Sequence, residues 1–238
     1  MLGTVLIQPP TFDALTYYGI AGIALVVTLI TRSIYSRAVP NRPVFEATVL
    51  GWVLLTALLA RFGVLAKFDV TPPPMVPLMV LCFLGPILVG LSPVGKSLAR
   101  NLSLGVLVLI QCFRLPLELI MHRAADLEIM PRELSYSGYN FDIVTGALAL
   151  VLGLALLRGA KVPKALVWIW NVWGSVCLLA IAVIAVSASP MVHKFGTEPQ
   201  NLNTWVVYFP YVWLPALLVF NAILTHVVIF RKLLGKTA

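Results

Sequence analysis

The sequence predicts an all-α fold, a polytopic integral membrane helical bundle with seven transmembrane helices. Of its 238 residues, 60% are hydrophobic and 11% are charged, and the mean hydropathy is +0.97. Soluble domains carry about 25% charged residues, so this composition fits a lipid bilayer as solvent. Seven apolar stretches approach or exceed the length that crosses about 30 Å of hydrocarbon. They form a single transmembrane domain, residues 1–238, with spans near 14–32, 44–64, 75–94, 102–122, 142–158, 165–187 and 205–230.

Apolar length is the main evidence for the first three spans. No basic residue precedes span 14–32, so we expect this span to direct insertion itself and not to be a cleaved signal peptide. Span 44–64 follows after a short basic loop. Span 75–94 contains Pro77 and Pro86, and proline inside a helix predicts a break.

A strong turn separates the fifth span from the sixth. Residues 158–164 contain Gly159, Pro163 and three basic residues, a composition that ends one helix before the next begins. Span 142–158 is short for a membrane crossing. We expect Asp142 to cap its N-terminus, since Asp is favoured at that position and interacts well with the helix dipole.

The seventh span, 205–230, contains Pro210 and Pro215 and is predicted to be interrupted. Transporters use broken helices to expose backbone groups to ions and substrates, so this pattern slightly favours a transport function.

The distribution of Lys and Arg predicts the N-terminus outside and the C-terminus inside. Cytoplasmic loops are enriched in these residues. In this orientation eleven basic residues lie inside and five outside, and Arg114 lies within the membrane. The inner set is Arg32, Arg37, Arg42, Lys96, Arg100, Arg158, Lys161, Lys164, Arg231, Lys232 and Lys236. The outer set is Arg61, Lys67, Arg123, Arg132 and Lys194. The expected location is the cytoplasmic (inner) membrane of a bacterium.

The candidate site lies in span 102–122. Arg114, Glu118 and His122 are four residues apart and therefore share one face of the helix. A charge in hydrocarbon costs about 2.5–3.5 kcal/mol unless it is paired or hydrated, so this face should look into the protein. Pro116 lies between the two charges and predicts a kink. These features together predict a polar cavity in the outer half of the bundle, open to the outer side.

The residue types suggest roles in this cavity. Arg114 would bind an anionic group or hold Glu118 ionised, and Glu118 would carry a proton or bind a cation. His122 and Asp142 would line the mouth. Weaker candidates are Asn140, Tyr139 and His193. The alternative is a structural lock in which Arg114 pairs with Glu118, although Arg before Glu is the less favoured order for such a pair.

A second polar cluster is expected near the inner side. It contains Asn171, Asn221 and His226, for which interhelical hydrogen bonds are a sufficient explanation. Counting along the helices places His226 more than about 20 Å from His122, so the two should not share a metal ion. We expect no metal and no cofactor.

Three functions remain open. The first is a small transporter or solute-binding permease, the second an intramembrane enzyme acting on a lipid or lipid-linked head group, and the third an accessory subunit of a membrane complex. The small-residue stretch 146–157 would serve the third as a packing face. Expected partners are membrane lipids, a small polar or anionic solute, and a second copy or a complex partner. Nucleic acid is not expected, because the net charge of +8 is explained by the basic loops.

Overall fold

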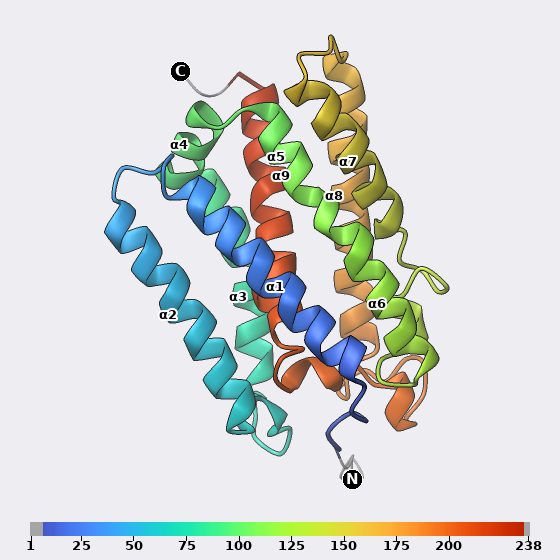
Figure 1. Cartoon of the computed structure of the whole chain (residues 1–238). Helices are drawn as coiled ribbons and strands as arrows, with labels where there is room; N and C mark the ends of the chain where they lie inside the picture. Colours follow the sequence, from blue (N-terminus) through green and yellow to red (C-terminus); the bar gives the residue numbers. More distant parts are fainter. Residues whose placement is uncertain (1–6, 236–238) are drawn as a thin grey trace.

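The chain folds into helices, with no strand anywhere in residues 7–235, the part that the computed structural model describes (Figure 1). The predicted all-α class is therefore confirmed. Lys236, one of the basic residues used to predict the orientation, lies outside the described residues.

Within residues 7–235, five helical segments are long and apolar enough to cross a membrane. They are α1 (Ala14–Tyr35), α2 (Arg42–Arg61), the joined segment Leu104–Asp126, α8 (Lys164–Ser187) and the joined segment Leu214–Leu233. The number becomes six if α3 (Met75–Leu91) and α4 (Pro93–Asn101), which meet at 66°, form one bent span. The apolar helix α7 (Asp142–Leu157) has 16 residues. These lengths and compositions are those of a helical membrane protein.

Both joined segments contain an irregular turn. Leu104–Asp126 consists of α5 (Leu104–Ile110), the 3₁₀ turn η2 (Gln111–Phe113) and α6 (Arg114–Asp126). The irregular turn η2 directly precedes the helix in which the sequence predicted a kink at Pro116. It places Pro116 in the first turn of α6, where a missing backbone N–H breaks no helical hydrogen bond. Leu214–Leu233 consists of the π-helical turn η6 (Leu214–Val219) and α9 (Phe220–Leu233).

Two expected helix positions were wrong. The last span begins as a helix at Leu214 and not at residue 205, because Pro210 disfavours a helical conformation for Phe209. In the third span, α3 continues through Pro86 to Leu91, and the bend follows at Ser92. The Ser92 hydroxyl accepts a hydrogen bond from the backbone N–H of Val94 and so caps α4.

Short polar side chains start several other helices. The Asp13 carboxylate accepts a 2.9 Å hydrogen bond from the backbone N–H of Thr16 at the start of α1. Asn41 caps α2 and Ser103 caps α5 in the same way. The expected cap at Asp142 was wrong by one residue: Asp142 is the first residue of α7, and its carboxylate turns to Arg114 instead.

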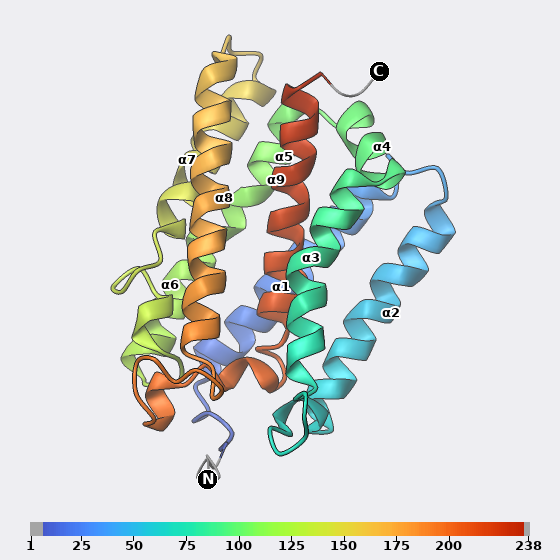
Figure 2. The ribbon, with the colours of Figure 1, turned by 180° about the vertical axis from the view of Figure 1, so that it is seen from behind.

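A central helix organises the bundle. α9 continues from η6 through the middle of the molecule. α3, α4, α5 and α8 pack against α9, and α1 packs against η6 (Figures 1 and 2). α7 packs against the segment α5–α6 on one side and against α8 on the other. α2 lies at the periphery of the bundle and joins it mainly through its second half. There the Trp52 indole N–H donates to the Ala216 carbonyl at 2.8 Å.

Side chains of α9 and α4 close the end of the bundle where α9 terminates. Arg231 donates to the carbonyls of Gly90 and Ser92 at 2.7 and 2.8 Å, which holds the bend between α3 and α4. Lys232 donates to the Ala99 carbonyl at 2.8 Å. Ser97 and Asn101 of α4 both donate to the carbonyl of Ala38, in the turn between α1 and α2.

Candidate functional site

The site forms where two helices begin inside the bundle. Arg114 is the first residue of α6, directly after the 3₁₀ turn, and Asp142 is the first residue of α7. At 1.5 Å per residue α7 is about 24 Å long, less than the hydrocarbon thickness. Its N-terminus lies partway along the bundle (Figures 1 and 2), and the preceding segment 127–141 turns inward to reach it. Leu134 and Asn140 of that segment are 4% and 1% exposed.

Arg114 forms its ion pair with Asp142 and not with Glu118. The guanidinium Nη1 lies 2.8 Å from Asp142 Oδ1, and the two side chains are 2% and 5% exposed. The structural lock expected between Arg114 and Glu118 is thus replaced by a pair that joins α6 to α7 across 28 positions in sequence.

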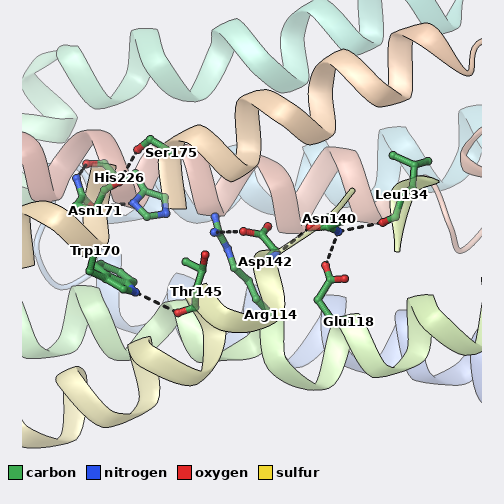
Figure 3. A network of polar contacts seen from close by, with 10 residues as sticks. All are labelled: Arg114, Glu118, Leu134, Asn140, Asp142, Thr145, Trp170, Asn171, Ser175 and His226. Atoms are coloured by element: carbon green, nitrogen blue, oxygen red, sulfur yellow. Dashed lines mark hydrogen bonds and ion pairs between the residues drawn. The ribbon is translucent and has the colours of Figure 1, made fainter. Parts of the chain in front are cut away.

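Asn140 connects this ion pair to Glu118 (Figure 3). Its amide nitrogen donates to Glu118 Oε1 at 2.8 Å and to the Leu134 carbonyl at 3.0 Å. Its amide oxygen accepts from the backbone N–H of Asp142 at 3.0 Å. Asn140 thereby fixes both the start of α7 and the carboxyl of Glu118.

The cluster expected near the inner side lies next to this group and continues it. In Figure 3, Thr145 and His226 follow Arg114 along the core. His226 Nδ1 lies 2.7 Å from Asn171 Oδ1, and Asn171 also donates to the His226 carbonyl at 3.2 Å. The Trp170 indole donates to the Thr145 carbonyl at 3.1 Å. Asn221 is separate from this pair, since it lines a groove beside α1 and α2.

Several buried polar atoms of this region have no hydrogen-bond partner among the described residues. They are Nε2 and Oε1 of Gln111, Nε and Nη2 of Arg114, Oε2 of Glu118, Oγ1 of Thr145 and Nε2 of His226. More than nine in ten buried polar groups in proteins are paired, so such a concentration calls for a specific explanation. A cavity of about 20 Å³ lies beside Arg114, Glu118 and Asp142, room for about one water molecule.

Gln111 and Thr145 were not among the residues expected at the site. Both are 0% exposed. Their spacing was a usable signal: Gln111 is three residues before Arg114, and Thr145 is three residues after Asp142. Side chains three apart lie on the same helical face.

The remaining candidates lie away from this network. His122 stacks on Tyr136 with ring centroids 4.2 Å apart, and its Nε2 lies 3.5 Å from the Asp126 carboxylate. Tyr139 is 61% exposed, and His193 lies in an exposed loop. The side chains that surround Arg114 are closed off from both surfaces, whereas the sequence predicted a cavity open to the outer side.

The charges of the network do not balance. Arg114 supplies one positive charge, and Asp142 and Glu118 supply two carboxyl groups. The group is neutral when it holds one proton or one monovalent cation, and carries one negative charge without it. An unbalanced charge at membrane depth costs several kcal/mol. The neutral form of the network therefore contains one proton or one monovalent cation. Across residues 7–235, no group of three or more His, Cys, Asp or Glu side chains is arranged to hold a metal ion.

Comparison with known families gave one match. Residues 72–234 match a family described as a domain of unknown function, DUF8737. The matched segment includes every residue of the network in Figure 3. No curated protein and no solved structure matched the chain.

Proposed function

The chain belongs to the DUF8737 family. From the geometry of its buried polar network, we propose that it is a small membrane transporter. Its solute and its coupling ion bind at the network around Arg114. The network consists of Arg114, Glu118, Asn140 and Asp142, with Gln111 and Thr145 beside them. Glu118 is the group that exchanges a proton or binds a cation. Arg114 is the group that receives an anionic or polar solute.

The charge imbalance of the buried network is the observation that carries this proposal. A purely structural pair such as Arg114 and Asp142 has no net charge by itself. Glu118 adds a second carboxyl within the same hydrogen-bonded group, and its Oε2 has no partner among the described residues. Because the network is neutral only with one extra cation, binding of an anionic solute and binding of that cation favour each other. Such linkage between solute and cation is one requirement for ion-coupled transport.

The irregular helices provide a means of opening the site. The 3₁₀ turn η2 directly precedes Arg114, and side chains of the π-helical turn η6 line the same small cavity. π-helical turns within α-helices occur frequently at functional sites, and 3₁₀ stretches inside helices often mark hinges. Movement at η2 and η6 would shift α6 against α9. Such a shift would expose Arg114 to one surface or the other.

We further propose seven membrane crossings, with the N-terminus outside, in the inner membrane of a bacterium. α1 begins and α9 ends at opposite ends of the bundle (Figure 1), which requires an odd number of crossings. Counting α3–α4 as one crossing and α7 as another adds two to the five long segments. The basic loops lie at the end where α9 terminates, as the enrichment of Lys and Arg in cytoplasmic loops requires.

Transport is favoured over the two alternatives by where the grooves and small residues lie. An enzyme acting on lipid would need a sideways groove that reaches Glu118, His122 or Asp142, whereas the grooves of about 450 and 530 Å³ beside α1 are lined by other residues. The small residues of 146–157, offered to a complex partner by the third hypothesis, pack within the chain. A Cβ on Gly153 would lie 2.7 Å from Leu109 Cα.

The test uses purified protein in liposomes that enclose a pH-sensitive dye. A panel of monocarboxylates, dicarboxylates, phosphate and amino acids is added outside, and acidification of the lumen reports solute entry coupled to protons. We expect at least one solute to acidify the lumen. Glu118→Gln should abolish the coupled signal, and Arg114→Ala should abolish uptake of that solute.

The matched control is Glu198→Gln, which makes the same chemical change at an exposed loop position. It should leave transport unchanged. Both site variants must elute as folded protein in detergent. Flux no greater than that of empty liposomes for the whole panel contradicts the proposal, and so does equal flux in wild type, Glu118→Gln and Arg114→Ala.

A further inference from the structure

A groove of about 450 Å³ lies between α1 and α2, away from the buried network. It exists because the first half of α2 stands apart from the bundle (Figures 1 and 2). Most of the lining surface is apolar, and η6 and α9 form its floor through Leu217, Phe220 and Leu224. Trp52, fixed to the Ala216 carbonyl, closes the groove toward the middle of the bundle.

Two polar features distinguish this groove from a chance gap between helices. Asn221 lines its floor, is 8% exposed, and has no hydrogen-bond partner for its Nδ2 among the described residues. At the mouth, Arg32 lines the groove, and Arg42 follows the lining residue Asn41 at the start of α2; both arginines donate to Glu46, each at 2.8 Å. Two guanidinium groups share one carboxylate, so the mouth carries one net positive charge.

We propose that this groove binds an acyl chain of an anionic glycerophospholipid. The chain fills the apolar space, Asn221 Nδ2 donates to an ester carbonyl, and the phosphate binds at the mouth to the N–H groups of Arg32 and Arg42 that do not bond Glu46. The mouth lies at the end of the bundle that carries most of the basic residues. In the orientation proposed above, this end meets the cytoplasmic leaflet, whose surface potential is negative.

The occupant follows from the combination of these features. A purely apolar partner, such as another transmembrane helix, would leave Asn221 Nδ2 unpaired in a dry site, which costs about 1–3 kcal/mol. It would also gain nothing from the positive mouth. A zwitterionic lipid offers the same ester and phosphate groups, but its cationic head group is repelled by the positive mouth. An anionic lipid supplies the acceptor for Asn221 Nδ2 and a net negative charge at the mouth.

Native mass spectrometry of the detergent-purified protein tests this proposal without any transport assay. The probes are 1-palmitoyl-2-oleoyl phosphatidylglycerol and the phosphatidylcholine with the same chains, each added at equal concentration. We expect retention of one phosphatidylglycerol in preference to phosphatidylcholine. In Arg32→Gln and Arg42→Gln the preference should fall about fivefold for each guanidinium removed, the size expected for one interfacial basic residue.

Matched controls separate the groove from general lipid affinity. Val49→Trp fills the groove from α2 and should remove the retained lipid, while Leu50→Trp adds the same side chain at a neighbouring position that is 58% exposed and should not. Arg37→Gln removes an exposed arginine from the same end, outside the groove, and should leave the preference intact.

Three results would overturn the lipid site. The first is equal retention of the two lipids by wild type. The second is equal retention of phosphatidylglycerol by Val49→Trp and Leu50→Trp. The third is a dimer mass that Val49→Trp abolishes, which would identify the groove as an interface between helices of two copies. Failure of this test leaves the transport proposal untouched, because the groove and the buried network share no residue.

Discussion

At the scale of single residues, the ion pair of Arg114 and Asp142 is the contact whose loss should most destabilise the fold. Both side chains are buried, and each charge compensates the other. Removing one partner of a buried pair is far more damaging than replacing both, because the remaining charge stays in a medium of low dielectric constant.

We therefore expect Arg114→Met to lower the free energy of unfolding by about 3–5 kcal/mol, because it leaves two buried carboxyl groups without their cation. The double substitution Arg114→Met with Asp142→Leu should lose less than Arg114→Met alone, since the Glu118 carboxyl that remains is neutral when protonated. Titration with sodium dodecyl sulfate, followed by circular dichroism, measures both values. A double variant less stable than the single one contradicts this assignment.

A second ion pair, between Asp13 and Arg123, lies outside the membrane-spanning part of α1. Arg123 donates to both Asp13 oxygens, at 2.9 and 2.7 Å. The Arg123 guanidinium holds the pKa of the Asp13 carboxyl well below its usual range, and the hydrogen bonds from Thr16 act in the same direction. The contact ties the start of α1 to the end of α6.

Because the folded pKa of Asp13 is lowered, its stabilisation is present above the unfolded value of about 3.9 and is lost as the pH falls further. The melting temperature of the wild type should therefore drop more steeply below about pH 4 than that of Arg123→Gln, which lacks the partner. Thermal melts from pH 2.5 to pH 7 in one detergent, compared between the two proteins, measure this difference. Parallel curves contradict it.

Sequence reasoning identified Arg114 and Glu118 because charges in apolar segments are conspicuous, and Asp142 as the first charge of the next span. Asn140 was only a weaker candidate, and the structure joins all four. It placed His226 in a separate inner cluster because counting residues treats each helix as a straight rod that begins at the membrane surface. α7 begins at depth instead. Gln111 and Thr145 were overlooked because an uncharged polar residue in an apolar run is usually explained by a local hydrogen bond.

At the scale of elements, glycine determines how closely α7 approaches α5. A Cβ on Gly153 would lie 2.7 Å from Leu109 Cα and 2.8 Å from Leu109 N, both backbone atoms that cannot move independently of the helix. Small residues at helix interfaces allow this close approach in membrane proteins. The same approach positions Asp142, at the start of α7, opposite Arg114.

Gly153→Ala should therefore push α5 and α7 apart and cost about 1–3 kcal/mol of stability. Gly51→Ala in α2 is the matched control, since a Cβ there meets nothing within 4 Å. It should be neutral or stabilise by up to about 1 kcal/mol, because Ala has the higher helix propensity. Unfolding curves in denaturing detergent measure the free energy of unfolding of both variants. An equal decrease in Gly153→Ala and Gly51→Ala would contradict the close packing of α5 and α7.

The element boundaries show where local sequence signals succeed and fail. Asp13, Asn41 and Ser103 start helices through ordinary caps. Proline was less informative, since Pro86 lies within a continuous α3 whereas Pro210 precedes the true start of the last helix. A proline inside an apolar span predicts an irregularity nearby, but tertiary packing determines at which residue the helix breaks.

At the scale of the whole molecule, the outer surface indicates its solvent. Leu50, Leu54 and Leu58 of α2 are each more than half exposed and lie one turn apart along the helix. Val151 of α7 and Ile169 of α8 are similarly exposed, at 65% and 67%. Soluble monomers do not present such continuous apolar surfaces to water. The same surface facing lipid explains why composition alone was sufficient to predict the fold class.

Orientation is the property of the whole chain that a single experiment can decide. Cys82, Cys112 and Cys177 are replaced by alanine, and one cysteine is introduced at exposed Lys161 or exposed Lys194. A membrane-impermeant maleimide should label position 194 in intact spheroplasts and position 161 only after permeabilisation. The physical reason is the excess of basic residues on the side of Lys161, which resists translocation across the membrane.

Labelling of both positions in intact spheroplasts would mean that 161 and 194 lie on one side, contrary to a crossing by α8. The reversed pattern would place the C-terminal end of α9 outside and refute the proposed orientation.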